Sequence, residues 1–242
     1  MRAVVKRQLE KRSLPLVLAH GGGAAHGREN SIEAIRESLR FDPDIIELDV
    51  RKSFDGVLYC HHGSIPVGVS AAQFYHLLTF FEIQTLVGHR NTLKEALTEI
   101  PSTSIVHLDL KDRRISAEDL KPLVMGRQNV WLGVWTLRHL RSLRKDLGDE
   151  FVFVLLRPLM FLKRNLTQLC SLADSVFLYP WQWNKKNAKE LAKAGIFCST
   201  VQGLYFRPHD KRMFIVEKKH AGIVRSYDDL RNNHRVKEAK KH

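Results

Sequence analysis

The stretch "DIIELDV", residues 44–50, has the composition of a buried strand and nevertheless carries two carboxylates, Glu47 and Asp49. Strands that are covered on both faces of a parallel sheet are near-continuous runs of Val, Ile and Leu. Side chains at positions i and i+2 of a strand lie on the same face. We therefore expect Glu47 and Asp49 to point the same way, at the carboxyl end of this strand.

Seven other stretches have the same strand-like composition, and amphipathic stretches lie between them. The strand-like runs are "PLVLA" (15–19), "SIVHLDL" (104–110), "VWLGVW" (130–135), "FVFVLL" (151–156), "SVFLY" (175–179), "IFCSTV" (196–201) and "AGIVRS" (221–226). The helical patterns are "SIEAIRESL" (31–39), "TLKEALTEI" (92–100), "SAEDLKPLV" (116–124), "LRHLRSLRK" (137–145) and "NKKNAKELAKA" (184–194). Eight strands separated by helices is the count of an α/β fold of the (β/α)₈ TIM-barrel type. A doubly wound open sheet is the alternative, but no Gly-rich dinucleotide motif follows the first run.

The alternation continues almost to the end of the chain without a linker or an internal repeat. It predicts a single domain over residues 1–242, with its core at about 14–230 and a basic, frayed tail at 231–242. Residues 57–91 exceed an ordinary βα connection, which indicates a short insertion after the second strand. Within this segment, "AAQFYHLLTFF" (71–81) predicts one helix.

The composition limits the classes of protein. The formal net charge is +13, which favours anionic partners such as phosphates or an anionic membrane surface at the periphery. Nucleic acid is not an expected partner, because no helix-turn-helix, zinc-finger or aromatic RNA-binding pattern accompanies the charge. The three scattered cysteines, the lack of a secretory signal and the lack of a long apolar run favour a cytoplasmic location.

Carboxylates from two strands are candidates for a metal site. Asp109 ends its strand as Asp49 does, and Lys111 follows two residues later. The carboxyl ends of barrel strands lie on one face of the barrel, where active sites form. Three carboxylates there would repel one another unless a cation lies between them, and Mg²⁺ or Ca²⁺ prefers such oxygen ligands. The alternative is that each carboxylate caps a helix or pairs with a neighbouring Lys or Arg.

Two histidines are candidates for acid–base chemistry. His20 closes the first strand-like run before a Gly-rich segment, and His62 follows the second run. Both would lie at the mouth of the same barrel, where one imidazole could take a proton and the other could donate one. Asn30 and Glu33 have the spacing of a capping box, which predicts a structural role for Asn30.

At these residues the chain resembles the glycerophosphodiester phosphodiesterases. The family motifs His-Arg-Gly, Pro-Glu-Asn-Thr, Glu-x-Asp-Val, Asp-Gly and His-Asp correspond in order to "AHGG" (19–22), "RENS" (28–31), "ELDV" (47–50), "DG" (55–56) and "HHG" (61–63). The later motifs correspond to "TLKEAL" (92–97), "DLK" (109–111), "STVQ" (199–202) and "GIVRS" (222–226). The spacing from Glu47 assigns the second family histidine to His62 rather than His61.

The resemblance implies a metal-dependent phosphodiesterase that cleaves glycerophosphodiesters or lysophospholipids to an alcohol and a glycerol phosphate. Its metal ligands would be Glu47, Asp49 and Asp109, its acid–base pair His20 and His62, and its phosphate contact Lys111. In the family the substrate's own 2-hydroxyl attacks phosphorus and leaves a cyclic phosphate, which water then opens.

The sequence departs from the family pattern at four positions. Gly21 replaces the arginine after the first histidine, Gly63 replaces an aspartate, Ser199 replaces a tryptophan, and Asp109 replaces a glutamate. The His62-Gly63 pair and the Asp109-Leu110-Lys111 trio look instead like the sphingomyelinase/phospholipase-D toxins of spiders. These departures leave open an impaired barrel that binds a phosphorylated ligand or a partner. Three residues are candidates to replace lost substrate contacts: Arg157, Trp181 and Trp183.

Overall fold

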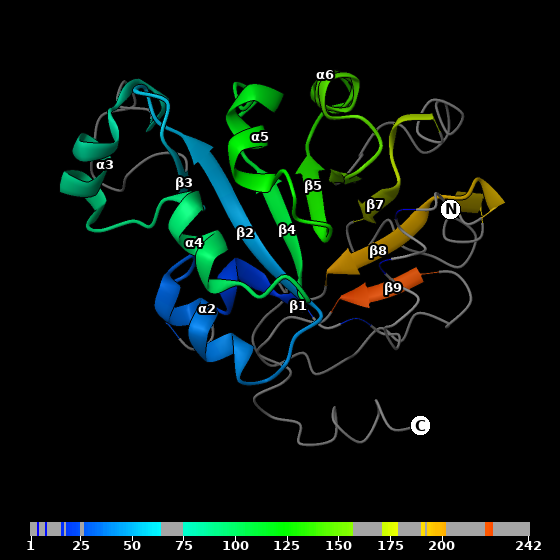
Figure 1. Ribbon diagram of the computed structural model, residues 1–242, viewed down its shortest axis with the longest axis horizontal. Coiled ribbons are helices and arrows are strands. Elements are labelled where there is room, and N and C mark those ends of the chain that lie inside the picture. Colours follow the sequence, from blue (N-terminus) through cyan, green and yellow to red (C-terminus); the bar gives the residue numbers. More distant parts are fainter. Residues whose placement is uncertain are drawn as a thin grey trace.

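The computed structural model describes residues 4, 8, 16, 18–24, 27–63, 75–156, 171–178, 190–191, 193–201 and 221–224, of which 197–201 and 221–224 are described by their backbone alone. Within these residues, nine strands form one sheet (Figure 1). They are β1 (Leu18–Ala19), β2 (Ile45–Lys52), β3 (Leu58–Cys60), β4 (Ile105–Leu110), β5 (Val130–Val134), β6 (Val152–Leu156), β7 (Ser175–Leu178), β8 (Phe197–Val201) and β9 (Ala221–Val224). Eight of them coincide with the eight strands predicted from the sequence.

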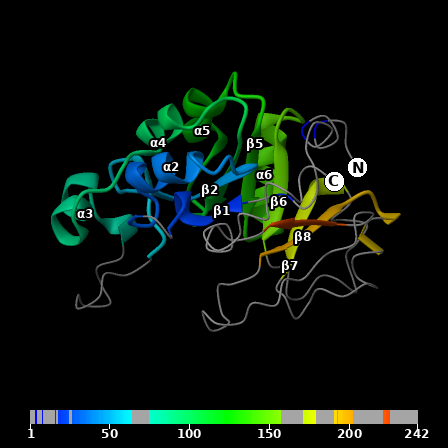
Figure 2. The ribbon, with the colours of Figure 1, turned by 90° about the horizontal axis from the view of Figure 1, so that it is seen from below.

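The sheet is parallel and its strands follow chain order. The pairing runs β1-β2-β4-β5-β6-β7-β8-β9, and among the described strands only β3 pairs antiparallel, with β2. A doubly wound sheet reverses its strand order at a switch point. No reversal occurs along this sequence of strands, so the doubly wound alternative is wrong. The sheet is curled rather than flat (Figures 1 and 2), and no pairing joins β9 to β1 within the described residues.

Helices follow the strands on the outer side of the curled sheet (Figure 2). They are α2 (Ile32–Leu39), α3 (Phe80–Val87), α4 (Leu93–Glu99), α5 (Ala117–Val124) and α6 (Leu137–Leu147), with short 3₁₀ turns at η1 (His20–Gly22) and η2 (Tyr75–Leu77). α2 packs on α4, α4 on α5, and α5 on α6. Each α-helix in this group begins after a Ser or Thr whose hydroxyl accepts a hydrogen bond from a first-turn amide, as sequences of this kind favour.

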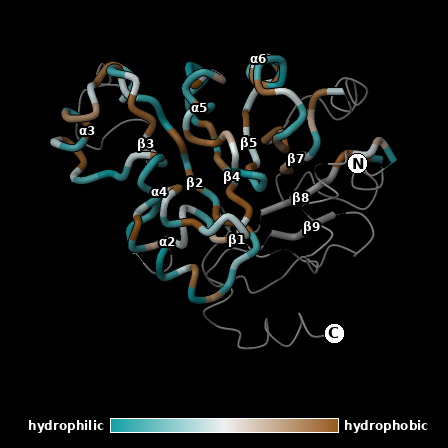
Figure 3. Tube along the Cα trace, in the orientation of Figure 1, coloured by the Kyte–Doolittle hydropathy of each residue, from teal (hydrophilic) through white to brown (hydrophobic). Residues whose placement is uncertain are grey.

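Alternation along β2 and β4 divides the core into two layers. Ile46, Leu48 and Val50 belong to the large cluster between the sheet and the helices, whereas Ile45 and Ile105 belong to an inner cluster with Trp131. The strands are accordingly rich in hydrophobic residues, which Figure 3 shows along β4. By the same alternation Glu47 and Asp49 share the inner face with Ile45. The pairing register sets Glu47 opposite His107 and Asp49 opposite Asp109.

The segment between β2 and α4 corrects one prediction. The helix expected at 71–81 is displaced, because Tyr75–Leu77 is a 3₁₀ turn and the α-helix begins at Phe80. Thr79 and Glu82 form a capping box, which fixes that start. The antiparallel strand β3 in the same segment was not predicted.

Two further predictions concern residues at the carboxyl-terminal end of the chain. The tail at 231–242 lies outside the described residues, as does most of the last predicted helix.

Within the part of the chain that the structure describes, no helix has both the length and the apolar character needed to cross a membrane.

Candidate active site

Three carboxylates converge at the carboxyl ends of β2 and β4. Glu47, Asp49 and Asp109 each offer an oxygen, and these oxygens lie within 4.8 Å of one another. Their exposed fractions are only 4%, 0% and 7%. The sequence prediction that these side chains meet is therefore confirmed, and the in-register pairing of Asp49 with Asp109 is the reason.

Lys111 lies against two of the three carboxylates. Its Nζ is 2.8 Å from Asp49 Oδ1 and 2.5 Å from Asp109 Oδ2. Nζ also lies 5.0 Å from the centre of the Trp135 ring, whose Nε1 donates to Asp109 Oδ1 at 2.8 Å. Burial lowers the pKa of Lys111, but Asp109 and Asp49 outweigh it and hold the pKa above its usual range. Lys111 is thus a charged ammonium beside the carboxylates.

Glu47 is the one carboxylate of the three that has no ion pair with Lys111. It accepts a hydrogen bond from the amide of Gly21 at 2.7 Å, and His20 Nε2 lies 3.8 Å away. Burial and the neighbouring charges of Asp49 and Asp109 raise the pKa of Glu47 well above its usual range. Burial likewise raises the pKa of Asp109, although Lys111 opposes this shift. The local positive charge is therefore smaller than three carboxylates require.

Asp49 is the centre of the cluster. His62 Nδ1 lies 3.1 Å from its Oδ2, which also accepts a hydrogen bond from Asn30 Nδ2 at 2.8 Å. Burial would raise the pKa of Asp49, but the hydrogen bond from His62 and the charge of Lys111 lower it strongly. Asp49 is therefore ionised at neutral pH.

The two candidate histidines contact different carboxylates, since His20 lies beside Glu47 and His62 beside Asp49. Burial lowers the pKa of His20, although Asp49 and Glu29 oppose this effect. The hydrogen bond to Asp49 raises the pKa of His62, although burial opposes it. The two imidazoles therefore favour different protonation states, as a proton acceptor and a proton donor need.

His61 has different surroundings from its neighbour. Its ring lies edge-on to Tyr75 with centres 4.8 Å apart, and its Nδ1 accepts a hydrogen bond from Arg90 Nε at 3.4 Å. Burial and Arg90 lower the pKa of His61 to about 4. The geometry agrees with the assignment made from sequence spacing, since the imidazole of His62, and not that of His61, contacts the Asp49 carboxylate.

Asn30 corrects a second prediction. The cap of α2 is Ser31, whose hydroxyl accepts from the Ala34 amide, so the predicted Asn30–Glu33 capping box is wrong. Asn30 instead binds Asp49 twice: its Nδ2 donates to Oδ2, and its Oδ1 accepts from the Asp49 amide at 2.9 Å. Its φ of 62° is the left-handed conformation that Asn tolerates better than most residues. Only the resemblance, in which an Asn occupies this motif position, could have indicated a role at the site.

Replacing Asn30 by Asp is expected to lower the free energy of unfolding of the metal-free protein by about 2 kcal/mol at pH 7. The change keeps the shape but replaces the donor to Asp49 with a second buried carboxylate oxygen. Urea unfolding measures the loss. Asn129→Asp is the matched control, because Asn129 donates to the Ser102 carbonyl at an exposed position. An equal effect of both changes would contradict a special role for Asn30.

The donor set fits a hard divalent cation. All three side chains offer carboxylate oxygens, and they are buried and crowded closely enough that burial and mutual repulsion raise the pKa of two of them. Carboxylate oxygens are the ligands that Mg²⁺ and Ca²⁺ prefer. A second group with similar spacing, Glu29, Asp49 and His62, shares Asp49 with the first.

The structure describes the space around two of the positions, Gly21 and Gly63, at which the sequence departs from the family motifs. Gly21 has a φ of 55°, and a Cβ there would lie 2.5 Å from Glu29 Cγ, so a side chain at this position would require Glu29 to move. A Cβ at Gly63 would approach His61 Nε2 at 3.0 Å. The residues predicted to replace lost contacts, Arg157, Trp181 and Trp183, lie outside the described residues. The backbone of Ser199 pairs in β8, and its side chain is not described.

The residues of this site fall within a region that is similar to known proteins. The "Glycerophosphoryl diester phosphodiesterase family" matches residues 20–146. Glycerophosphodiester phosphodiesterase GDPD4 of Arabidopsis thaliana is 35% identical over a region that covers 40% of this chain and 34% of that protein. The chain thus spans about a third of the length of this curated relative.

Solved structures show the same fold. A glycerophosphodiester phosphodiesterase from Thermotoga maritima superposes with a TM-score of 0.73 at 19% identity, over 91% of this chain and 98% of that one. The enzyme of the same name from Agrobacterium tumefaciens gives 0.66 at 20% identity, over 90% and 99%. A phosphodiesterase from Oleispira antarctica in complex with the product sn-glycerol-3-phosphate gives 0.70 at 15% identity, over 90% and 96%.

Proposed function

The chain belongs to the glycerophosphoryl diester phosphodiesterase family, and on this premise we propose that it hydrolyses glycerophosphodiesters to an alcohol and a glycerol phosphate. The observation that supports this most is the meeting of three buried carboxylates, two of which have an imidazole beside them. Lysophospholipids are the second substrate class that this chemistry would accept. We also propose that the curled sheet closes into a single (β/α)₈ barrel, since eight parallel strands follow one another in chain order.

Glu47, Asp49 and Asp109 would hold one divalent cation, Mg²⁺ or Ca²⁺. When bound, such an ion supplies positive charge that stabilises the added negative charge on phosphoryl oxygens. Asn30 keeps Asp49 in place through two hydrogen bonds, and the Gly21 amide keeps Glu47 in place. These contacts fix the carboxylate oxygens before any ligand arrives.

His20 and His62 would move the protons. One imidazole takes the proton of the attacking hydroxyl, and the other donates a proton to the alcohol oxygen as its bond to phosphorus breaks. Each imidazole lies beside a different carboxylate of the cluster, His20 beside Glu47 and His62 beside Asp49, so the two can act on different oxygens of one phosphoryl group. Lys111, the ammonium beside Asp49 and Asp109, would contact a non-bridging phosphate oxygen.

The product in the Oleispira antarctica complex suggests the assay. The purified chain is incubated with glycerophosphocholine, glycerophosphoglycerol and lysophosphatidylcholine, first with EDTA and then with Mg²⁺ or Ca²⁺. Phosphorus NMR follows the appearance of glycerol phosphate and of any cyclic intermediate. We expect turnover only with the metal. No metal-dependent turnover of any diester would instead favour an impaired barrel that binds a phosphorylated ligand.

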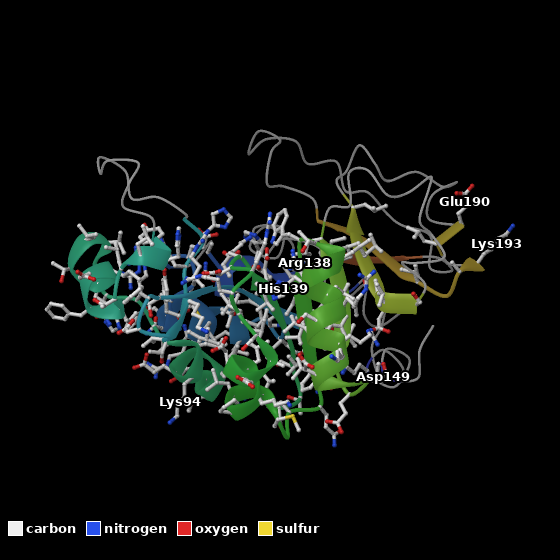
Figure 4. The ribbon with its side chains drawn as sticks, turned by 90° about the horizontal axis from the view of Figure 1, so that it is seen from above. Lys94, Arg138, His139, Asp149, Glu190 and Lys193 are labelled. Carbon is white, nitrogen blue, oxygen red and sulfur yellow. The ribbon has the colours of Figure 1, made fainter. Side chains whose placement is uncertain are left out.

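Asp49→Asn is expected to raise the metal concentration for half-maximal binding at least about tenfold, because an amide oxygen carries no formal charge. Calorimetric titration with Mg²⁺ or Ca²⁺ measures this without an activity assay. Asp149→Asn is the control, since Asp149 lies past the end of α6 opposite to Arg138 and His139 (Figure 4) and is mostly exposed. Unchanged metal affinity in Asp49→Asn would remove Asp49 from the ligand set.

A further inference from the structure

A pocket with a positively charged wall lies beside the three carboxylates. Its volume is 290 Å³, and Lys111 belongs to both the pocket wall and the carboxylate cluster. Five cationic side chains and one acidic side chain line it: Arg51, Lys52, Lys111, Arg113, Arg114 and Asp112. This excess of positive charge is local and does not follow from the chain's overall charge alone.

Three of the five cations already have acidic partners. Lys52 pairs with Asp119 at 2.7 Å, and Arg114 pairs with Asp112 at 2.6 Å. Lys111 pairs with the site carboxylates, as described above. The pocket's free positive charge must therefore come from the remaining two arginines.

Arg51 and Arg113 have no carboxylate within ion-pair distance among the described residues. Among the described residues, Arg51 donates only to the backbone carbonyls of His61, at 3.2 Å, and His62, at 2.8 Å. A half-buried guanidinium without a carboxylate partner is what an anion-binding pocket offers.

Tyr59 is the independent sign of a ligand. Tyr59 is 0% exposed and lines the pocket, and its hydroxyl has no hydrogen-bond partner among the described residues. It lies directly opposite Arg51 in the β2–β3 pair. Buried hydroxyl groups in folded proteins are nearly always hydrogen-bonded, so this one is available to a ligand.

The pocket adjoins the candidate active site on the side where Lys111 lies. Arg51 holds the carbonyl of His62, the proposed acid–base residue, and Lys111 touches Asp49 and Asp109. A diester whose phosphorus lies at the carboxylates would extend one of its two alcohol groups past Lys111 into the pocket.

We infer that the pocket receives an anionic group, a phosphomonoester, at the far end of the alcohol that the enzyme releases. The preferred substrate is then a glycerophosphodiester with a phosphorylated head group rather than one with a cationic head group such as choline. This inference rests on the proposed function. Tyr59 and Arg113 are the residues that would contact the distal phosphate, and Arg51 would add a half-buried positive charge beside them.

The test compares two substrates that differ by one phosphate. These are glycerophosphoglycerol and the same diester phosphorylated at its terminal glycerol, each at saturating metal. We expect kcat/KM to be at least about tenfold higher for the phosphorylated diester, since hydrogen bonds to charged groups are the strong ones. Equal values for the two would overturn the inference.

Variants assign the preference to the pocket. Tyr59→Phe is expected to reduce it about threefold to tenfold without lowering the melting temperature, because the lost hydroxyl has no partner in the described part of the protein. Arg113→Glu is expected to abolish it. Lys94→Glu is the matched charge reversal, since Lys94 is exposed on α4 and projects away from the strands (Figure 4); it should leave the preference unchanged. A preference that survives both pocket variants would overturn the inference.

Binding separates this inference from the proposed function. Inorganic phosphate is titrated into metal-free protein and into the same three variants, with calorimetric detection. Phosphate binding that weakens in Tyr59→Phe and Arg113→Glu but not in Lys94→Glu supports the pocket, even if no diester is cleaved. Metal-dependent hydrolysis with no effect of either pocket variant on selectivity or phosphate binding refutes the pocket and leaves the proposed function intact.

Discussion

Replacing His62 by alanine is expected to lower kcat by about a hundredfold or more, the usual contribution of a positioned acid–base group. The adjacent His61 provides an internal control, because His61→Gln removes an imidazole one residue away and is expected to leave kcat within about threefold. His62 contacts Asp49, whereas His61 packs edge-on against Tyr75 and accepts a hydrogen bond from Arg90. Glutamine keeps an acceptor for Arg90.

His20→Ala should lower kcat to a similar degree as His62→Ala, since the reaction needs both an acceptor and a donor of protons. Steady-state kinetics with a metal-saturated enzyme measures the loss, and circular dichroism melting verifies that each variant is folded. Activity retained in His62→Ala but lost in His61→Gln would reverse the assignment of the second histidine. Activity retained in His20→Ala would mean that another group moves the first proton.

The strands and the carboxylate cluster were predictable from the sequence because both follow from local rules. A run such as residues 104–110 is apolar enough to be a buried strand, and the spacing of two residues between Glu47 and Asp49 fixes their common face. The meeting of Asp49 with Asp109 required only that two parallel strands be neighbours with their carboxyl ends level. No long-range contact had to be known in advance.

The errors arose where a residue's partner is distant in the chain. Asn30 precedes a helix and has an acidic residue three positions later, so the local pattern favours a cap. Its actual partner is Asp49, 19 residues away, and the cap role passes to Ser31. The anion pocket was not predictable for the same reason, because β2, β3, η2 and the segment after β4 contribute its wall. Sequence shows many scattered arginines but not which of them lack an acidic partner.

The surroundings of His107 predict that acid lowers the free energy of unfolding substantially. It lies in the inner layer opposite Glu47, 2% exposed, and both of its ring nitrogens lack hydrogen-bond partners among the described residues. Its ring stacks on Phe177 with centres 5.2 Å apart. Gly133 makes room for it, since a Cβ there would lie 2.5 Å from His107 Nε2. Burial, with a smaller effect of Lys111, lowers the pKa of His107 to about 3.

The direction of the pH effect follows from where the proton binds. In the unfolded chain His107 titrates at the ordinary histidine pKa of 6.5, whereas in the folded protein its lowered pKa keeps it neutral to a pH of about 3. Below pH 6.5 the unfolded state therefore binds a proton that the folded state excludes. Above pH 6.5 His107 is neutral in both states and its titration does not affect the free energy of unfolding. Below pH 6.5 the free energy of unfolding falls as the pH falls, because the unfolded state binds more protons. At about 1.36 kcal/mol per unit, lowering the pH from about 6.5 to about 4.5 removes about 2 kcal/mol through this residue.

His107→Leu is expected to remove this part of the acid sensitivity. Leucine has a similar volume and no polar atoms, so the free energy of unfolding at pH 7 should be equal to that of the parent or higher. The parent-minus-variant difference, measured by urea unfolding in EDTA, should then become more negative by about 2 kcal/mol between about pH 6.5 and about pH 4.5. His139→Leu is the comparison variant. His139 is also buried, but its Nε2 lies 2.7 Å from the Ile115 carbonyl, so this replacement also removes a hydrogen bond, whereas His107→Leu removes none among the described residues. If the difference stayed constant over this range, His107 would be protonated in the folded state, and the inner layer beneath the carboxylates would have to contain a compensating acceptor.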